Sequence, residues 1–158
     1  MQLTIEKLIH GGSGVGTFEG KKIFVPFTAP GDVVEARITK DHGNFAEAEL
    51  VRVISASTER VSPPCPVFGR CGGCQWQHLS YASQLKWKRA IMVESLNRIG
   101  KLELKAAEEL VLPTQASPKQ WHYRNRIQLH VRNEKVGFYA PKTNEVVEFS
   151  ECFIAHEQ

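Results

Sequence analysis

The chain has 158 residues, of which 42% are hydrophobic, 23% charged and 9% aromatic. These proportions are typical of a globular protein and exclude collagen-like, low-complexity and largely disordered chains. The net charge of +3 is too small to indicate a nucleic-acid partner by itself. No run of about 18 apolar residues occurs, so no membrane helix is expected. The N-terminus lacks the pattern of a signal peptide, which favours a cytoplasmic location.

Charge and cysteine are distributed unevenly along the chain, and this indicates two modules. Residues 1–58 carry a balance of −1, whereas residues 59–158 carry +4 and all four cysteines. Small polar residues and a proline pair at 55–64 end the apolar periodicity, which is typical of a linker. We therefore predict one domain over residues 1–58 and a second over residues 59–158.

The first module has the pattern of a small β-barrel. Apolar and polar residues alternate at 34–39 and 46–50, and glycine-rich or Pro-Gly turn signals divide the module into about five short strands. That number and spacing favour a closed, OB-like barrel. The segment 11–16 matches neither a dinucleotide fingerprint nor a phosphate loop. We interpret it as a glycine-rich turn, with close approach of an RNA backbone as the alternative.

The cysteines carry the most specific chemistry in the sequence. Cys65, Cys71 and Cys74 are clustered, and Cys152 follows much later. A disulfide framework does not suit a chain without a secretory signal, and Cys71-Gly-Gly-Cys74 lacks the strand–helix context of a redox pair. Two alternatives remain open on spacing. A zinc site would use the first three cysteines with His78, and an iron–sulfur site would use all four thiolates.

A helix is expected over residues 80–100. Ser80 is a suitable N-cap and Gly100 a suitable stop. Trp87 lies outside the apolar stripe and has no partner in the pattern. The residues that form the stripe at helical spacing are Tyr81, Leu85, Met92, Leu96 and Ile99.

The C-terminal part has strand patterning. Alternation over 126–132, a turn at 133–134 and strands at 136–139 and 146–149 predict an antiparallel meander that returns Cys152 toward the other cysteines. Basic and aromatic residues interleave over 119–132, which fits either an RNA-binding surface or a polar strand face. The candidate RNA-binding residues are Lys119, Arg124, Arg126 and Arg132.

Taken together, these motifs resemble the amino-terminal part of the bacterial RNA (uracil-5-)-methyltransferases, which form 5-methyluridine in ribosomal and transfer RNA. The resemblance covers essentially the whole chain. Its most specific element is the C-x5-C-G-G-C-x-x-Q-H signature with a distant fourth cysteine. The matching residues are Gly11-Gly-Ser-Gly-Val-Gly16, Val25-Pro-Phe27, Pro30-Gly-Asp-Val33, Cys65 to His78, Tyr123-Arg-Asn-Arg126 and Cys152.

This resemblance implies a TRAM-type RNA-binding barrel followed by part of a central iron–sulfur domain. It implies a [4Fe-4S] cluster held by Cys65, Cys71, Cys74 and Cys152. Family members use S-adenosylmethionine and a cysteine nucleophile in a later catalytic domain. This chain contains neither a glycine fingerprint for that cofactor nor a fifth cysteine. It is therefore expected to be inactive alone and to continue into a methyltransferase domain, on which the helix at 80–100 would partly pack.

The expected fold is mainly β with one or two helices (α+β), an OB-like barrel followed by a small cysteine-rich antiparallel domain. The expected partner is ribosomal or transfer RNA. Two other functional classes remain open. One is a free-standing RNA-binding protein with a zinc or iron–sulfur knuckle, and the other is an iron–sulfur electron carrier.

Overall fold

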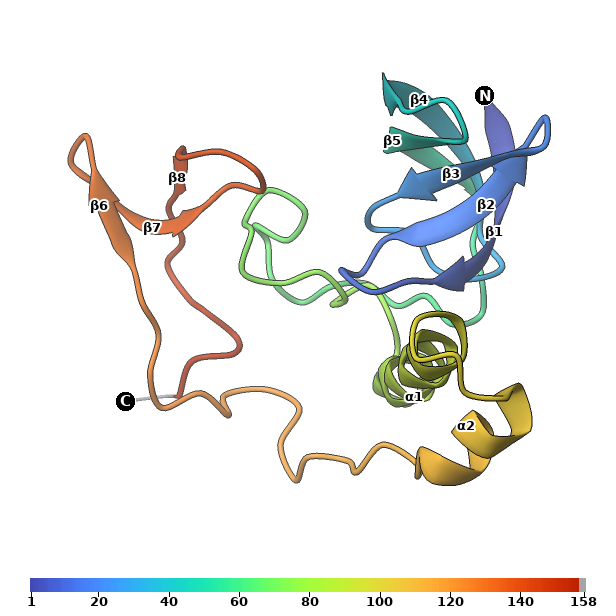
Figure 1. The fold of residues 1–158 in the computed structure, drawn as a ribbon. Helices are drawn as coiled ribbons and strands as arrows, with labels where there is room; N and C mark the ends of the chain where they lie inside the picture. The colour runs from blue at the N-terminus through green and yellow to red at the C-terminus, as the bar shows by residue number, and fades with distance from the viewer. Residues whose placement is uncertain (157–158) are drawn as a thin grey trace. The chain divides into compact units, whose positions relative to one another are not determined.

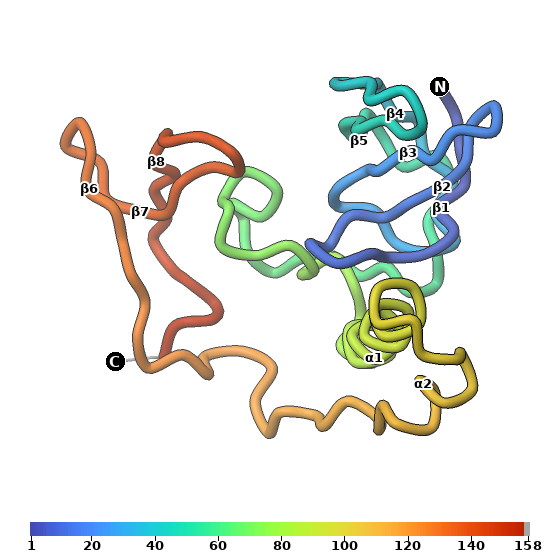
Figure 2. Tube along the Cα trace, in the orientation of Figure 1, coloured from blue at the N-terminus to red at the C-terminus, as the bar shows by residue number. Residues whose placement is uncertain are grey.

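The computed structural model describes residues 1–156, and Figures 1 and 2 trace its elements. The chain is mainly β with two helices, as the sequence predicts. Its strands are β1 (Gln2–Leu8), β2 (Gly14–Phe18), β3 (Lys21–Val25), β4 (Val33–Asp41), β5 (Phe45–Ser55), β6 (His130–Arg132), β7 (Lys135–Tyr139) and β8 (Val146–Val147). The helices are α1 (Tyr81–Arg98) and α2 (Leu104–Leu110).

The first five strands close into a barrel in the order β1-β2-β3-β5-β4, which confirms the predicted OB-like architecture. All neighbours are antiparallel except β3 and β5, which run parallel. Alternate residues point inward, and each large apolar side chain buried there stabilises the fold by about 1.5–3 kcal/mol. The buried core residues are Leu3, Ile5, Ile23, Val25, Val34, Ala36, Ala46 and Ala48.

The glycine-rich segment at 11–16 serves two structural purposes in the barrel. Gly11 and Gly12 have φ values of 89° and 93° and turn the chain from β1 into β2, as the sequence predicts. Gly14 and Gly16 lie within β2, where neighbouring atoms approach closely. A Cβ on Gly16 would lie 2.3 Å from the carbonyl oxygen of Thr4. The glycines therefore allow tight strand packing as well as a turn.

Helix α1 begins and ends close to its predicted limits, but it buries a different face. The Ser80 hydroxyl accepts a hydrogen bond from the Ser83 backbone N–H at 3.2 Å, as expected of an N-cap. Ser83 and Val93 are the buried residues, whereas Met92 is 54% and Ile99 82% exposed. The predicted apolar stripe is therefore wrong at both of these positions. Apolar spacing alone does not reveal that a small polar residue, Ser83, is buried on this helix.

Trp87 finds its polar partner within the chain. Its indole N–H donates to a carboxylate oxygen of Glu59 at 2.6 Å, and the Lys86 ammonium donates to the other oxygen at 2.6 Å. Glu94 of α1 also accepts a 2.5 Å hydrogen bond from Lys7 of β1. These contacts attach the helix to the barrel and to the segment that leaves it.

The last three strands form a small antiparallel sheet in the order β6-β7-β8. Asn133 and Glu134 turn β6 into β7 with φ values of 51° and 63°, which is typical of a two-residue type I′ hairpin. The predicted strand over 126–132 is shortened to His130–Arg132. Its earlier residues lack a partner strand in the described part of the chain.

The chain divides into two units by internal contacts. The barrel unit comprises residues 1–61 and 78–116, and the cysteine unit comprises residues 62–77 and the chain from 117 onward. The division suggested by the sequence after residue 58 places the helix at 80–100 in the second domain. In the structure, α1 and α2 belong to the barrel unit. Neither helix is both long and apolar enough to cross a membrane, a statement limited to residues 1–156.

Candidate functional site

The four cysteines, which come from two segments of the cysteine unit, line one cavity. Cys65, Cys71 and Cys74 lie on the loop over residues 62–77, and Cys152 follows β8. The loop is held to the sheet because the Gly72 N–H donates to the Tyr139 carbonyl at 2.9 Å. A Cβ on Gly72 would lie 2.7 Å from the same oxygen, so the glycine permits this approach.

Apolar side chains form the rest of the cavity wall. Phe138 of β7 and Phe149 stack with their ring centroids 5.4 Å apart and 16° between their planes. Such a wall limits the access of water to the partly exposed cysteines and lowers the local dielectric. The apolar residues around the cysteines are Val67, Phe68, Phe138, Phe149, Phe153 and Ile154.

Burial raises the pKa of the Cys71 and Cys74 thiols above the ordinary value of a cysteine. Repulsion from the other cysteines raises both pKa values further. Hydrogen bonding from the Gly73 N–H, 3.4 Å from the Cys71 sulfur, acts in the opposite direction but does not prevail. Burial and the neighbouring cysteines thus disfavour the thiolate form of both residues, and a bound cation would favour it.

The donor set fits a four-thiolate cluster. All four cysteines line the cavity, whereas His78 does not and belongs to the barrel unit. The His78 ring Nε2 lies 3.1 Å from the Thr28 carbonyl oxygen of the barrel. Within residues 1–156, no group of three or more His, Cys, Asp or Glu side chains is gathered tightly enough to hold a single metal ion.

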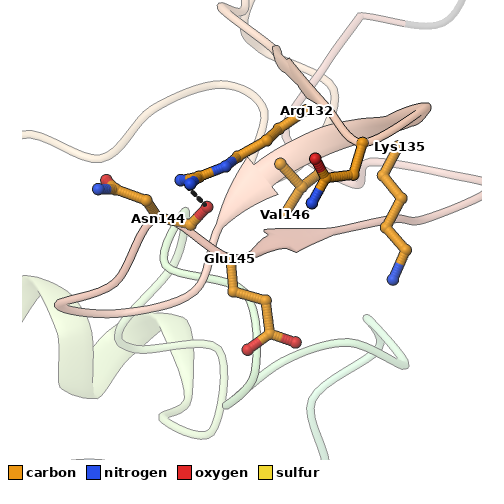
Figure 3. Close-up of a pocket in the computed structure, with 6 residues that line it drawn as sticks. Arg132, Lys135, Asn144, Glu145 and Val146 are labelled. Carbon is orange, nitrogen blue, oxygen red and sulfur yellow. Dashed lines mark hydrogen bonds between the residues drawn. The ribbon is translucent and has the colours of Figure 1, made fainter.

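The predicted RNA-binding residues are all exposed on the cysteine unit. The Arg124 guanidinium lies 5.9 Å from the ring centroid of Tyr123, and its backbone pairs with the segment after Cys152. Arg132 ends β6, and its Nη1 donates to the Asn144 carbonyl at 3.3 Å (Figure 3). Lys119 and Arg126 lie in the irregular segment before the sheet.

Charge pairing distinguishes the two units. Several ion pairs lie within the barrel unit, including Lys21–Asp41, Lys22–Glu6 and Arg52–Glu35. Among the described residues, no ion pair is formed by Lys119, Arg124, Arg126 or Arg132, and all four side chains are exposed. Such charge is available to phosphate groups.

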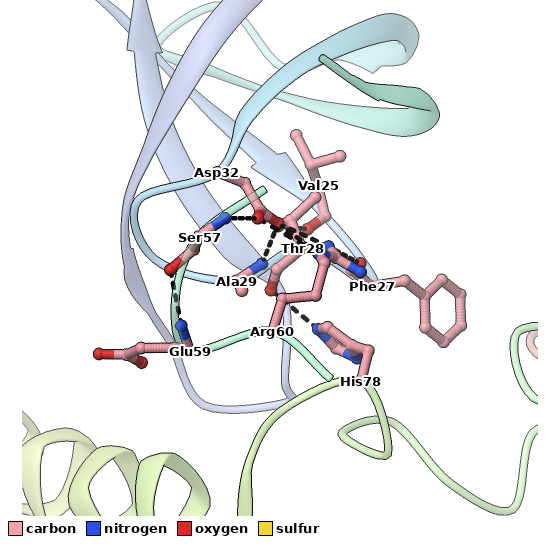
Figure 4. Close-up of polar contacts among 9 residues, drawn as sticks. All are labelled: Val25, Phe27, Thr28, Ala29, Asp32, Ser57, Glu59, Arg60 and His78. Carbon is pink, nitrogen blue, oxygen red and sulfur yellow. Dashed lines mark hydrogen bonds and ion pairs between the residues drawn. The ribbon is translucent and has the colours of Figure 1, made fainter. Parts of the chain in front are cut away.

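A buried ion pair that the sequence did not predict organises the base of the barrel (Figure 4). Asp32 accepts hydrogen bonds from the Arg60 guanidinium at 2.5 Å and from the Ala29 and Ser57 N–H groups at 2.7 and 2.9 Å. Arg60 also donates to the Phe27 carbonyl at 2.9 Å. The network attaches the segment after β5 to the turn before β4. Only the Pro-Gly turn beside Asp32 marked this position in the sequence.

The chain is similar to known proteins in sequence and fold. Residues 1–51 match the family model of the TRAM domain. Proteins described as uncharacterized RNA methyltransferases are similar over the whole chain. That of Aquifex aeolicus is 42% identical over 158 residues, covering 100% of this chain and 36% of the relative. That of Bdellovibrio bacteriovorus is 40% identical, covering 99% of this chain and 39% of the relative.

A solved structure is also similar over nearly the whole chain. The tRNA (uracil-54, C5)-methyltransferase of Pyrococcus abyssi, in complex with S-adenosyl-L-homocysteine, is 32% identical, with a TM-score of 0.63. The match covers 99% of this chain and 33% of that chain. The present chain thus spans about a third of the length of these relatives. Residues 1–51 thus match a TRAM domain, and the whole chain is similar to part of longer proteins described as RNA methyltransferases.

Proposed function

We propose that this chain is the RNA-recognition and [4Fe-4S]-binding portion of an S-adenosylmethionine-dependent RNA (uracil-5-)-methyltransferase, which forms 5-methyluridine in ribosomal or transfer RNA. One observation carries the proposal. Four cysteines from two distant segments line a single cavity, in a chain 32% identical to a tRNA uracil-C5 methyltransferase. Methyl transfer itself is assigned to the length of such proteins that this chain does not cover.

The cluster would be held by Cys65, Cys71, Cys74 and Cys152. When bound, it supplies four metal–thiolate bonds that join the loop over residues 62–77 to the segment after β8. The chain contributes the surroundings. The phenylalanine wall limits the access of water, and the Gly73 N–H donates a hydrogen bond to the Cys71 sulfur, which favours the thiolate form.

RNA recognition is assigned to both units. The TRAM barrel supplies one RNA-binding module, and the cysteine unit adds the exposed cations Lys119, Arg124, Arg126 and Arg132. In support of this division, the basic residues of the barrel strands are largely paired with carboxylates, whereas these four form no ion pair within residues 1–156.

The two helices offer a surface for the remainder of a longer enzyme. Met92 and Ile99 of α1 and Leu104 and Leu110 of α2 are between 51% and 82% exposed. Because the chain spans about a third of its relatives, we propose that part of this apolar surface packs on the methyltransferase domain. Trp87 has its polar partner in Glu59 and is not needed for that contact.

Anaerobic purification of the wild-type chain tests the cluster assignment. The protein should be brown, and Cys152→Ala should abolish the colour because one ligand is lost. Ser150→Ala is the matched control, since it alters an exposed neighbour and should leave the colour unchanged. Colourless protein with one zinc ion, lost in His78→Ala but retained in Cys152→Ala, would instead establish a zinc knuckle.

A further inference from the structure

One face of the β6–β7 hairpin combines cations with a flat aromatic pair. Arg132 pairs directly with Lys135 in the antiparallel register, so their side chains share a face. His130 and Tyr139 fall on the same face because side chains alternate along each strand. Their rings stack with centroids 3.9 Å apart and 13° between planes. Phe138 points to the opposite face, where it lines the cysteine cavity.

A hollow of about 460 Å³ lies at the end of this face. Its volume is within the usual range of small-molecule sites. The Arg132 guanidinium is directed across it by the 3.3 Å hydrogen bond to the Asn144 carbonyl (Figure 3). The residues around the hollow are Arg132, Asn133, Lys135, Asn144, Glu145 and Val146.

The electrostatics of the hollow favour a ligand that both accepts and donates hydrogen bonds. Within the described residues, neither Arg132 nor Lys135 forms an ion pair, so both can meet a phosphate. Glu145 is a hydrogen-bond acceptor at the same hollow and can receive an N–H from a nucleobase. A nucleotide offers both groups, whereas an acidic side chain offers only acceptors.

We propose that this face is a nucleotide subsite for single-stranded RNA. The phosphate lies on Arg132 and Lys135, and the base lies against the His130–Tyr139 pair. The inference rests on the proposed RNA-binding function and adds three residues to it, because Lys135, His130 and Tyr139 were not among the candidates from the sequence. Cations alone would bind any polyanion, but the adjacent stacked rings suit an unpaired base.

Fluorescence anisotropy with a labelled single-stranded RNA oligonucleotide tests the subsite across a range of salt concentrations. Arg132→Gln with Lys135→Gln should raise Kd about tenfold and reduce the slope of log K against log salt by about 0.7 for each lost cation. His130→Ala should raise Kd at least about fivefold through lost stacking while leaving the slope unchanged. Lys105→Gln, on α2 in the barrel unit, is the charge-matched control and should bind as the wild type does.

The outcomes distinguish failure of the nucleotide subsite from failure of the proposed RNA-binding function. If the wild-type chain does not bind RNA, the proposed function fails and the subsite with it. If the wild type binds but the Arg132/Lys135 double variant matches Lys105→Gln in Kd and slope, the subsite alone is refuted. Binding of a poly-glutamate peptide instead of RNA, lost in the same double variant, would overturn the inference in favour of an acidic protein. Circular dichroism of each variant shows that folding is retained, and Arg132→Lys with Lys135→Arg should restore the slope.

Discussion

Asp32 is a carboxylate with no exposed side-chain surface, and its ionisation depends entirely on its neighbours. Burial by itself raises the pKa of Asp32. Hydrogen bonds from Arg60 and from the Ser57 and Ala29 N–H groups outweigh that effect and hold the pKa below its usual value. The charged form is therefore part of the folded barrel.

Removing this charge should destabilise the protein. Asp32→Asn keeps the size of the side chain but leaves the Arg60 guanidinium, 20% exposed, without its counter-ion. The free energy of unfolding at neutral pH should fall by about 3 kcal/mol, as measured by urea denaturation. Glu35→Gln, which breaks an exposed pair with Arg52, should leave the unfolding curve almost unchanged. Equal effects of the two variants would contradict the structural importance of the buried pair.

His78 predicts a pH dependence of stability. Burial lowers the pKa of His78 below its ordinary value of 6.5, and the bond to Thr28 only partly offsets this. Between the folded and unfolded pKa values, the unfolded chain binds a proton that the folded chain does not. Stability is therefore expected to fall as the pH drops below about 6.5. Asp32, with a lowered pKa, adds a further loss only below its usual value of 3.8.

Urea midpoints at about pH 7.5 and 5.5 measure the contribution of His78. The wild-type midpoint should decrease at the lower pH, and His78→Gln should show a smaller decrease. The matched control is His10→Gln, which alters an exposed histidine and should retain the full decrease. A decrease of the same size in His78→Gln would assign the effect to other groups.

At the scale of the elements, β2 depends on the absence of a side chain at Gly16. A Cβ there would approach the Thr4 carbonyl to 2.3 Å, so Gly16→Ala must separate β1 from β2. We expect a loss of about 2 kcal/mol or more in the free energy of unfolding. Gly20→Ala isolates the cost of a positive φ, because its φ is 77° but nothing lies within 4 Å of the added Cβ. That variant should lose about 1 kcal/mol. If Gly16→Ala proves the milder of the two, the close approach is incorrect.

The sequence predicted those elements that depend only on a local pattern of residues. Alternation revealed the barrel strands, and the Asn133–Glu134 turn and the Ser80 cap appeared where expected. Features that depend on distant partners were not predictable. They include the parallel pairing of β3 with β5, the short α2 and the buried face of α1. Residues 126–129 alternate like a strand but find no partner in the described structure, which is why β6 is short.

At the scale of the whole molecule, the cysteine spacing left a zinc site and an iron–sulfur site open, and the fold bears on which residues can share a site. The C-terminal meander places Cys152 at the same cavity as the other three cysteines, whereas His78 hydrogen-bonds within the barrel unit. The buried Asp32–Arg60 pair could not be anticipated, since nothing near either residue in sequence identifies its partner 28 positions away. Lys135 was not predicted to lie beside Arg132, because their proximity follows from the register of β6 and β7.

The metal content of the anaerobically purified chain tests whether the four cysteines hold a [4Fe-4S] cluster. Iron, acid-labile sulfide and zinc are measured on the same sample, with protein concentration from amino-acid analysis. A [4Fe-4S] cluster predicts about four iron and four sulfide per chain with negligible zinc, and loss of both in Cys152→Ala but not in Ser150→Ala. One zinc ion per chain without sulfide, unaffected by Cys152→Ala, would contradict the [4Fe-4S] assignment.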